Sequence, residues 1–325
     1  MEVIDKECFF EIQLKMDWIS PHQCLGWLNY LEMRDDTSIC YFVDNMENTT
    51  ICSWGRLIKK KYVGSFLKIY GESYKGDILK NNIKGFYSSI SDFALKNNIA
   101  FIDVMTDNLY NINYELGIRQ AGFIRPMTLA LCPLSIIVEL DKELEPSRIW
   151  RRQFKKAQEQ NLSFRYIDKP NEDHIQFLCS MYGEMVKTKH LKSCLKESVI
   201  KILLKDSSFH LFFVYSENGE PLAARVIYIM KNFSYDIIAA NSDRARLIKG
   251  TTYFLMENIF LWLKKINVRH FDFGRIGPSL ETSNHVYEFK SYSGGKEVQY
   301  NGEWIRSFKK SWLEYLIVWK AHERW

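Results

Sequence analysis

Two short motifs towards the C-terminal end of the chain carry side chains that could do chemistry. An apolar strand ends in Phe271-Asp272-Phe273-Gly274, and after a loop the chain reads Tyr287-Glu288-Phe289-Lys290-Ser291-Tyr292-Ser293-Gly294-Gly295. Lys290 follows an aromatic residue and precedes a Gly-Gly turn, so its ammonium could be held against a phosphate or a developing oxyanion. The alternative is a surface lysine at the start of a strand.

Asp272 is the second candidate in this region. Its neighbours are apolar and Gly274 follows it, so its carboxylate is expected at the end of a strand, a common place for a site. It could equally cap the loop that follows. Spacing reveals no Ser-His-Asp arrangement. Four residues are open as a general base: His270, His285, Asp103 and Glu288.

The order strand, Asp-Phe-Gly, loop, Phe-Lys, aromatic residue and Gly-Gly resembles the C-terminal signature of the FemABX peptidyltransferases. Ser20-Pro21-His22-Gln23-Cys24-Leu25-Gly26-Trp27 is similar to the family's Q-S-x-x-W opening. The stretch from Arg148 to Ala157 is similar to its R-x-x-x-x-K-A segment. The resemblance covers nearly the whole chain. It implies a doubled acetyltransferase-like (GNAT) fold and an acyl- or aminoacyltransferase.

The resemblance also implies roles for individual residues. Acyl transfer to an amine needs the acyl carbonyl beside the amine, a donor for the developing oxyanion, and a route for the departing proton. Lys290 would serve as the oxyanion donor and Asp272 would be its catalytic companion. In aminoacyl transfer the leaving ester can itself take the proton, so a dedicated base is not required. Residues expected at the substrates are Phe289, Tyr292, Trp27 and Asp103.

The sequence departs from the family pattern at two points, of which the first concerns the acceptor. Leu31 stands where some members carry a Lys that contacts the acceptor's phosphates, which speaks against a UDP-linked muropeptide. Lys187, Lys189 and His190 fall where the family often has a basic residue for such phosphates. No long heptad pair interrupts the second half, so the coiled-coil arm of some members is missing.

Composition describes an ordinary globular chain. Its 325 residues suffice for two domains, and 46% hydrophobic with 26% charged residues argues against disorder. The net charge of +5 suits an anionic partner without requiring one. Seven cysteines without a C-x-x-C pair argue against a disulfide framework and a zinc site, so no metal is expected. The same cysteine usage favours a reduced, cytoplasmic setting. A charged start without a signal peptide and the lack of a long apolar run predict a soluble protein.

One pattern of elements occurs twice. Strands are expected at 39–43, about 50–58, 67–70 and 100–104 with a helix at 78–97, and again at 211–215, 222–230, 235–240 and 268–273 with a helix at 251–266. One face of the first helix is apolar and is expected to be buried: Ile83, Phe86, Ile90, Phe93 and Ala94. Asp103 and Asp272 occupy equivalent positions, 169 residues apart. We therefore predict a mixed α/β fold of two tandem GNAT-like domains, 1–145 and 146–305, with a C-terminal helix at 306–325 that packs on the first. The alternative is a single larger α/β domain with coincidental spacing.

Basic residues cluster in two segments that could bind phosphates. An expected helix carries five cations, which could contact tRNA or a nucleotide-linked acceptor or simply form a solvated face: Arg148, Arg151, Arg152, Lys155 and Lys156. A GNAT fold normally holds the CoA pyrophosphate on an Arg/Gln-x-x-Gly-x-Gly/Ala loop at a helix start. Here that loop has one glycine and the wrong spacing, which weakens a CoA donor. Three cations of the loop could still bind an anion: Arg244, Arg246 and Lys249.

Three functions remain open. The leading hypothesis is an aminoacyltransferase that moves an amino acid from aminoacyl-tRNA to an amine of a cell-wall (peptidoglycan) precursor, without a cofactor. The second is an N-acyltransferase that uses acyl-CoA or an acyl carrier on an envelope sugar or lipid. The third is a non-catalytic GNAT-fold binding module. The expected partners are the charged tRNA and the envelope precursor, with peripheral contact to a membrane surface and no stable protein partner.

Overall fold

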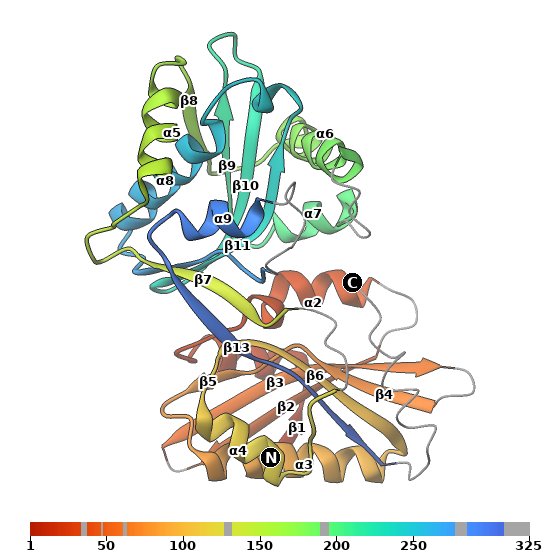
Figure 1. Cartoon of the computed structure of the whole chain (residues 1–325). Coiled ribbons are helices and arrows are strands. Elements are labelled where there is room, and N and C mark those ends of the chain that lie inside the picture. Colours follow the sequence, from red (N-terminus) through yellow and green to blue (C-terminus); the bar gives the residue numbers. More distant parts are fainter. Residues whose placement is uncertain are drawn as a thin grey trace. The chain divides into compact units, whose positions relative to one another are not determined.

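The computed structural model describes residues 1–33, 38–46, 48–60, 64–126, 132–188, 195–276 and 285–308. The chain divides into two compact units (Figure 1). Unit 1 comprises Met1–Pro133 and Val298–Trp325, and unit 2 comprises Leu134–Glu297. Unit 2 is therefore inserted between two segments of unit 1. Within the described residues no helix has both the length and the apolar character needed to cross a bilayer.

Unit 1 is a mixed sheet in the order β1-β2-β3-β4-β6-β13, with the short β5 paired to β3. All neighbours are antiparallel except β4 and β6, which are parallel. Its strands are β1 (Glu2–Ile4), β2 (Ser38–Met46), β3 (Thr49–Lys60), β4 (Gly64–Ile69), β5 (Ser73–Lys75), β6 (Ile99–Leu109) and β13 (Lys296–Ser307). Its helices are α1 (Lys6–Gln13), η1 (Pro21–Gln23), α2 (Leu25–Glu32), α3 (Lys80–Lys96) and α4 (Ile112–Gln120).

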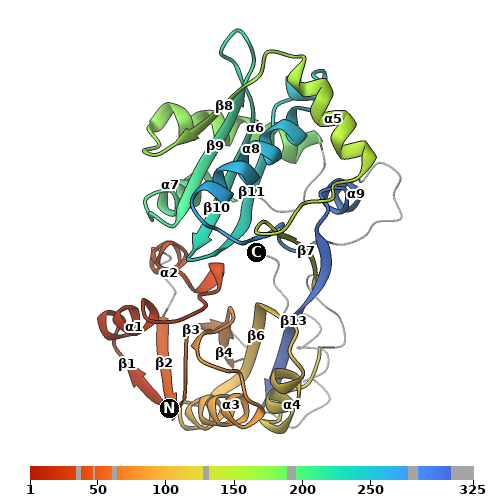
Figure 2. The same ribbon diagram turned by 90° about the vertical axis from the view of Figure 1, so that its left-hand side faces the viewer.

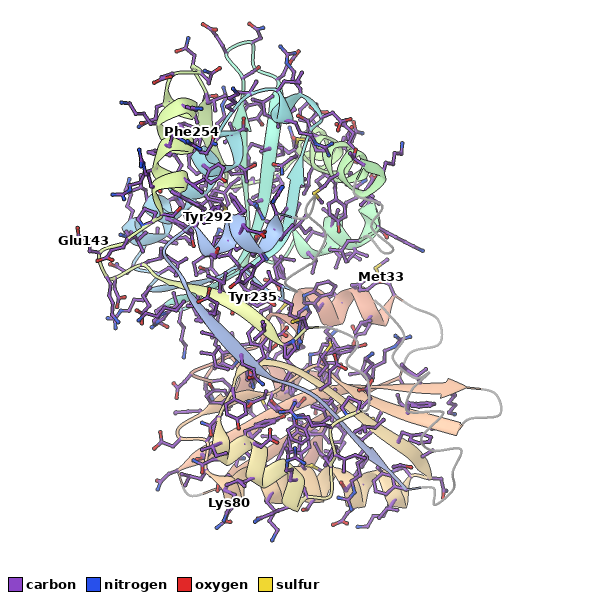
Figure 3. The ribbon with its side chains drawn as sticks, in the orientation of Figure 1. Met33, Lys80, Glu143, Tyr235, Phe254 and Tyr292 are labelled. Atoms are coloured by element: carbon purple, nitrogen blue, oxygen red, sulfur yellow. The ribbon has the colours of Figure 1, made fainter. Side chains whose placement is uncertain are left out.

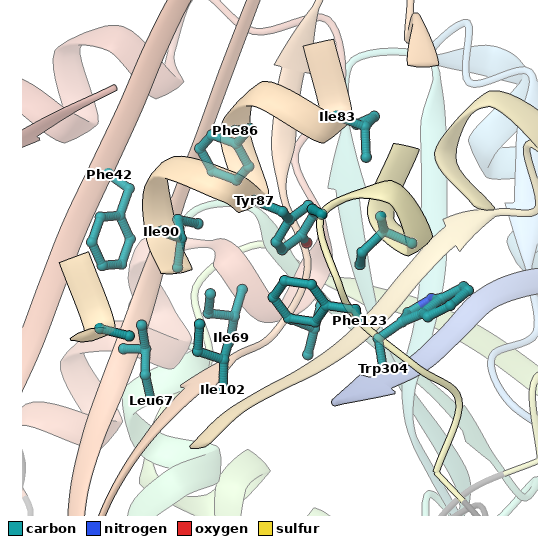
Figure 4. Packing of buried hydrophobic residues seen from close by; sticks show 14 of the residues in the cluster. Phe42, Leu67, Ile69, Ile83, Phe86, Tyr87, Ile90, Ile102, Phe123 and Trp304 are labelled. Carbon is teal, nitrogen blue, oxygen red and sulfur yellow. The ribbon is translucent and has the colours of Figure 1, made fainter. Parts of the chain in front are cut away.

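The core of unit 1 lies between one face of this sheet and α3. Of the predicted apolar face of the helix, Ile83, Phe86, Ile90 and Ala94 are buried in this core (Figure 4), and Phe93 is half-buried against it. Side chains two residues apart on a strand share a face, and the alternation of β4 and β6 directs Leu67 and Ile102 into this core. Trp304 of β13 completes the cluster from the far end of the chain.

Unit 2 repeats this architecture in the order β7-β12-β11-β10-β9-β8, where β11 and β12 form the parallel pair. Its strands are β7 (Leu134–Glu139), β8 (Ser163–Ile167), β9 (Phe209–Tyr215), β10 (Pro221–Met230), β11 (Phe233–Asn241) and β12 (His270–Asp272). Its helices are α5 (Arg148–Gln158), α6 (Glu172–Thr188), α7 (Glu197–Leu203), η2 (Arg244–Arg246), α8 (Thr251–Lys265) and α9 (Val286–Ser291). Figures 1 and 2 show α5 beside α8 on one face of the sheet and α6 on the other.

The two units correspond element by element. Each has a strand, two helices, a three-stranded antiparallel meander, a helix of 15 or 17 residues (α8 and α3), a parallel strand and a further helix. Asp103 and Asp272 lie on the strand that follows the long helix, each opposite a residue of its parallel neighbour, Lys68 and Tyr235. The basic helix α5 lies outside this correspondence. The doubling predicted from the sequence is thus present, with element bounds that differ by a few residues.

The unit boundaries differ from the predicted 145/146 and 305/306. β7 pairs with β12, so the second unit begins at Leu134. β13 pairs with β6, so the chain returns to the first unit at Val298. Arg306 and Ser307 belong to this strand and do not begin the helix predicted at 306–325. The remainder of that helix lies outside the described residues.

Candidate active site around Lys290

Lys290 is buried near the end of β12 in unit 2. It lies on the short helix α9 with 9% of its surface exposed, and its Nζ donates a hydrogen bond of 2.6 Å to the carbonyl oxygen of Phe273. Phe289 fixes the helix, because its ring stacks on Trp150 at 5.3 Å and meets Tyr253 edge-on at 5.1 Å. Phe289, which is predicted as a substrate contact, thus packs against unit 2 and holds Lys290 in place.

The acceptor of this hydrogen bond lies just past the end of a strand pair. The parallel ladder of β11 and β12 stops at Tyr235 and Asp272, while β11 runs on to Asn241. Phe273 follows the last pair, and Gly274 turns the chain away with φ = 72°, a conformation that favours glycine. The end of the ladder thus presents a backbone carbonyl to the ammonium.

Asp272 organises this turn. Its carboxylate is buried, accepts a hydrogen bond of 2.8 Å from the Gly274 amide, and also accepts one from Ser135. The Ser135 hydroxyl lies within 2.8 Å of the Gly274 carbonyl as well. These contacts match the capping role weighed for Asp272, and they hold the turn that carries the Phe273 carbonyl.

A buried ion pair that the sequence patterns did not predict lies beside Lys290. Arg225 of β10 and Asp236 of β11 are joined by an Nη1–Oδ2 distance of 2.6 Å, with side chains 7% and 5% exposed. The sequence gives a weak indication of these two buried charges, because each is a single charged residue in a mostly apolar strand. Arg225 lies in Pro221–Met230 and Asp236 in Phe233–Asn241. Charged residues are almost never buried unless paired. That the two residues pair with each other cannot be predicted from their neighbours in the sequence, because the ion pair joins two strands.

Charges around Lys290 act in opposite directions. Burial lowers the pKa of Lys290 to about 8; Asp236 and Asp272 raise it, and Arg225 lowers it further. Burial raises the pKa of Asp236, and this is opposed by Arg225 and Lys290. An amine with a pKa of about 8 is mostly protonated at neutral pH, so Lys290 is an ammonium there. Within the described residues it makes one hydrogen bond, which leaves two N–H groups for a ligand oxygen.

The other predicted substrate contacts are dispersed. Tyr292 directly follows α9, and its carbonyl accepts from the Ser147 amide at 2.9 Å (Figure 3). Trp27 and Asp103 belong to unit 1, where Trp27 is buried beside His22 and Asp103 lies 3.5 Å from Lys68. Lys187 is exposed at the end of α6, in unit 2. Lys189 and His190 lie outside the described residues.

The four candidates for a general base are also scattered. His285 is exposed at the start of α9, His270 is half-buried in β12, and Asp103 lies in unit 1. Glu288 has one buried carboxylate oxygen, Oε2, without a hydrogen-bond partner. None of the four is among the charged groups that act on Lys290. In the described parts of the chain, no three His, Cys, Asp or Glu side chains gather as a metal site would require.

The basic helix α5 is anchored by one face and leaves its cations free. Trp150 is fully buried against Tyr253, Phe260 and Phe289, and Phe154 stacks on Phe254 of α8 at 6.2 Å (Figure 3). Four of the predicted phosphate-binding cations are exposed and the fifth is half-buried: Arg148, Arg151, Arg152, Lys155 and, half-buried, Lys156. Among the residues described, none of these five is in an ion pair.

The loop before α8 does not form a pyrophosphate site of the usual kind. Arg244 pairs with Glu220 and Arg246 pairs with Asp243 at 3.5 Å, while Lys249 is exposed. Gly250 has φ = 87°, and a Cβ there would overlap the carbonyl oxygen of Gln153 on α5. Helix α5 therefore packs against the amino end of α8, where backbone N–H groups would otherwise meet an anion.

No protein-family model matches the sequence, and no curated protein matches it. Solved structures are similar in fold. The crystal structure of FemX matches with a TM-score of 0.80 and 11% identity, covering 98% of this chain and all of that one. L-PGS from Bacillus licheniformis matches with a TM-score of 0.64 and 17% identity over 100% and 99% of the chains. A tandem GNAT protein from the clavulanic acid pathway matches at 0.52 and 9%, over 94% and 97%. The predicted doubled GNAT fold is confirmed.

Proposed function

We propose that this protein is an aminoacyltransferase that moves an amino acid from aminoacyl-tRNA to an amine of a cell-wall precursor. The observation that carries the proposal is the buried ammonium of Lys290, with two N–H groups uncommitted, at the end of β12 in a fold shared with FemX. Preorganised donors in a buried site stabilise a developing oxyanion far better than donors in water. The pattern Phe289-Lys290 that resembles the FemABX signature coincides with this group.

The reaction assigns a task to each part of the site. The acceptor amine attacks the ester carbonyl of the donor, forming a C–N bond while the C–O bond to the terminal ribose breaks. Lys290 donates to the carbonyl oxygen as it gains negative charge, and the proton of the attacking nitrogen ends on the ribose oxygen. Asp272 holds the turn whose Phe273 carbonyl positions Lys290. No cofactor is needed for this chemistry.

The exposed cations of α5 suit the phosphates of the donor tRNA. A helix with four exposed and unpaired cations attracts a polyanion, and contacts to phosphates position it without reading its sequence. Charged tRNA is found in the cytoplasm, so the protein is expected there. A lipid-linked acceptor would add peripheral contact with the membrane surface, and a stable protein partner is not required.

The acyl-CoA alternative is disfavoured by the start of α8. The amino end of this helix packs on α5, and two of the three nearby cations are already paired with carboxylates. The non-catalytic alternative gives no reason for the burial of Lys290. Burial lowers the pKa of this side chain, and an ammonium with N–H groups left unpaired in the interior costs free energy of folding. Both alternatives predict measurable outcomes that differ from those of the proposal.

The test is a transfer assay with the purified protein. It is incubated with tRNA charged with a mixture of amino acids, with acetyl-CoA, and with cell-wall precursors as acceptors, and products are identified by mass spectrometry. We expect aminoacyl transfer from tRNA, a rate that falls as pH rises through about 8 as Lys290 loses its proton, and a loss of at least about 100-fold in Lys290→Ala.

The matched control is Lys296→Ala, which removes an exposed lysine of the same unit and should leave the rate within about twofold. Turnover with acetyl-CoA alone would replace the proposal by the acyl-CoA alternative. Wild-type turnover in Lys290→Ala would remove Lys290 from the mechanism. Binding of the substrates without turnover would favour the binding module.

A further inference from the structure

Asp236 carries a buried carboxylate oxygen that has no hydrogen-bond partner. Its Oδ2 accepts from Arg225 at 2.6 Å, while its Oδ1 is buried and unpaired. Nearly all buried polar atoms of folded proteins are hydrogen-bonded, and leaving one unpaired costs about 1–3 kcal/mol. A charged oxygen that remains unpaired beside a candidate active site is therefore ready to receive a donor from a ligand.

A β-bulge turns Asp236 towards this position. The register of β10 and β11 shifts by one residue between Val226 and Ile227, so that Ile227 lies opposite Asp236 and Ile237 is left without a partner. Arg225 and Ile227 are two residues apart on β10 and share a face, so the bulge brings Asp236 onto the face of Arg225. Without it Asp236 would lie opposite Tyr228 and point to the other face. The corresponding pairing in unit 1, β3 with β4, runs from Gly55/Ile69 to Lys60/Gly64 without such a shift.

Lys290 offers the complementary half of a binding site. Its ammonium has two uncommitted N–H groups. Of the negative charges that raise the pKa of Lys290, Asp236 has the largest effect. In the described structure no ion pair joins the two groups, so the lysine does not satisfy Oδ1. Lys290 bonds to the carbonyl of Phe273, and the next residue, Gly274, packs against the backbone of Asp236, because a Cβ on Gly274 would lie 3.2 Å from the Asp236 carbonyl oxygen. A free donor and a free acceptor therefore lie near each other in unit 2, both nine-tenths buried.

We propose that Asp236 receives the α-amino group of the transferred aminoacyl residue while Lys290 binds the carbonyl oxygen of the same residue. An α-aminoacyl ester presents these two groups on adjacent carbons, one accepting and one donating hydrogen bonds, which matches the two side chains. The proposal rests on the proposed function and deepens it, because it names the acyl class. An acyl group that lacks the amine would leave Oδ1 unpaired in the complex.

Asp236 is thus a specificity residue, since the amine that it binds takes no part in bond making. Arg225 is its positioning partner, holding Oδ2 so that Oδ1 faces the ligand. A structural role alone would require Asp236 only to neutralise Arg225. The two roles differ in one respect: only recognition of the amine makes the effect of an Asp236 variant depend on whether the donor carries that amine.

The experiment compares two matched donors with the full-length protein. Terminal adenosine carrying alanine through a non-hydrolysable 3′-amide is one probe, and the same molecule with propionate in place of alanine is the other. Binding is measured by calorimetry. Transfer from tRNA acylated with alanine or with propionate is measured in parallel. We expect the wild type to prefer the amine-bearing member at least about tenfold in both measurements.

The variant Asp236→Asn keeps the shape and an acceptor for Arg225 but removes the charge. We expect it to lose the preference, with affinity for the alanyl probe falling at least about tenfold and affinity for the propionyl probe unchanged within about twofold. The control Asp168→Asn removes an exposed carboxylate of the same unit and should keep the preference. Thermal unfolding checks that each variant is folded.

The outcomes separate this inference from the proposed function. Discrimination in binding without any transfer would support the role of Asp236 and contradict the transferase. Transfer of alanine and propionate at equal rates by the wild type would overturn the role of Asp236 and leave the transferase standing. An equal loss with both probes in Asp236→Asn, or no binding of either probe to the wild type, would overturn it as well.

Discussion

The side chain of Lys290 combines a cost to folding with a gain for chemistry. Burial of an ammonium is unfavourable, and the single hydrogen bond to Phe273 offsets it only in part. The result is a pKa of about 8 against an ordinary value of 10.5, so the folded protein holds this proton less tightly than the unfolded chain does. Perturbed groups of this kind concentrate at functional sites.

The stability of the wild type relative to Lys290→Met should therefore depend on pH. Between pH 8 and 10.5 the unfolded chain binds the proton and the folded protein does not, so the wild type gains stability as pH rises, by up to about 3 kcal/mol. The methionine variant lacks this gain. Denaturant unfolding of both proteins across this window measures the difference. A difference that does not change with pH would show that Lys290 titrates normally, and Lys296→Met is the exposed control.

Among the secondary-structure elements that the structure describes, the helix α5 of unit 2 has no counterpart in unit 1. It is fixed through Trp150 and through close packing of its backbone on the start of α8, where Gly250 leaves no room for a side chain. Its cations face away from this contact and find no anionic partner in the described residues. These features make α5 a rigid, charged surface carried by the same packing that anchors Phe289 and α9.

Gly250→Ala should loosen this attachment. An alanine with φ near 87° is strained, and its Cβ would overlap the Gln153 carbonyl, so we expect a loss of about 2–4 kcal/mol in the free energy of unfolding. Gly183→Ala is the matched control, since Gly183 lies within α6 with open space around it and should gain about 0.5–1 kcal/mol. Thermal and denaturant unfolding measure both. An unchanged stability of Gly250→Ala would contradict the close contact of α5 and α8.

Removing cations from α5 should weaken tRNA binding without affecting the fold. For the triple variant Arg151→Gln, Arg152→Gln, Lys155→Gln we expect weaker binding and a salt dependence whose slope falls by roughly 0.7–0.9 for each phosphate that is no longer neutralised. Titration of labelled tRNA at several salt concentrations measures the slope. The control Lys75→Gln, Lys84→Gln, Lys96→Gln removes three exposed cations from unit 1. Equal effects of the two triples would mean that net charge alone acts.

At the scale of the whole molecule, unit 1 is discontinuous in sequence and unit 2 is not. The sheet of unit 1 ends in β13, which from Val298 onward lies beyond the 164 residues of the inserted unit. Trp304 of this strand is fully buried in the core of unit 1 and its ring lies under Arg125 at 3.7 Å. Completion of unit 1 therefore depends on the far end of the chain, while each unit keeps a hydrophobic core of its own.

Trp304→Ala should destabilise unit 1 selectively. Removing a fully buried Trp costs about 3–5 kcal/mol through reduced burial and a residual cavity. Hydrogen exchange followed by mass spectrometry should show faster exchange in β4, β6 and α3, and little change in β9 and β10 of unit 2. Equal acceleration in both units would contradict separate cores. The converse variant Trp150→Ala should affect unit 2 first, because its ring is buried between α8 and α9.

Part of the candidate site is predictable from the sequence. The apolar run before Asp272 and the glycine after it predict a strand end, and Asp272 is the last residue of β12. Lys290 lies instead on the short helix α9, where it is buried and not on the surface at the start of a strand. Arg225 and Asp236 give only a weak signal because each interrupts an apolar strand singly, and their distance of 2.6 Å depends on the pairing of β10 with β11 and on its bulge. Phe289 is predicted as a substrate contact, but its packing against Trp150 does not follow from its neighbours in the sequence.

The sequence by itself determined the order of the elements, their doubling and the buried face of α3, because hydrophobic periodicity is a property of neighbouring residues. The tertiary structure alone decided where one unit ends, which strands pair across long separations, and which charges lose their water. Pairing and desolvation depend on groups far apart in the chain. For that reason the lowered pKa of Lys290 and the unpaired oxygen of Asp236 arise only once β10, β11, β12 and α9 have come together.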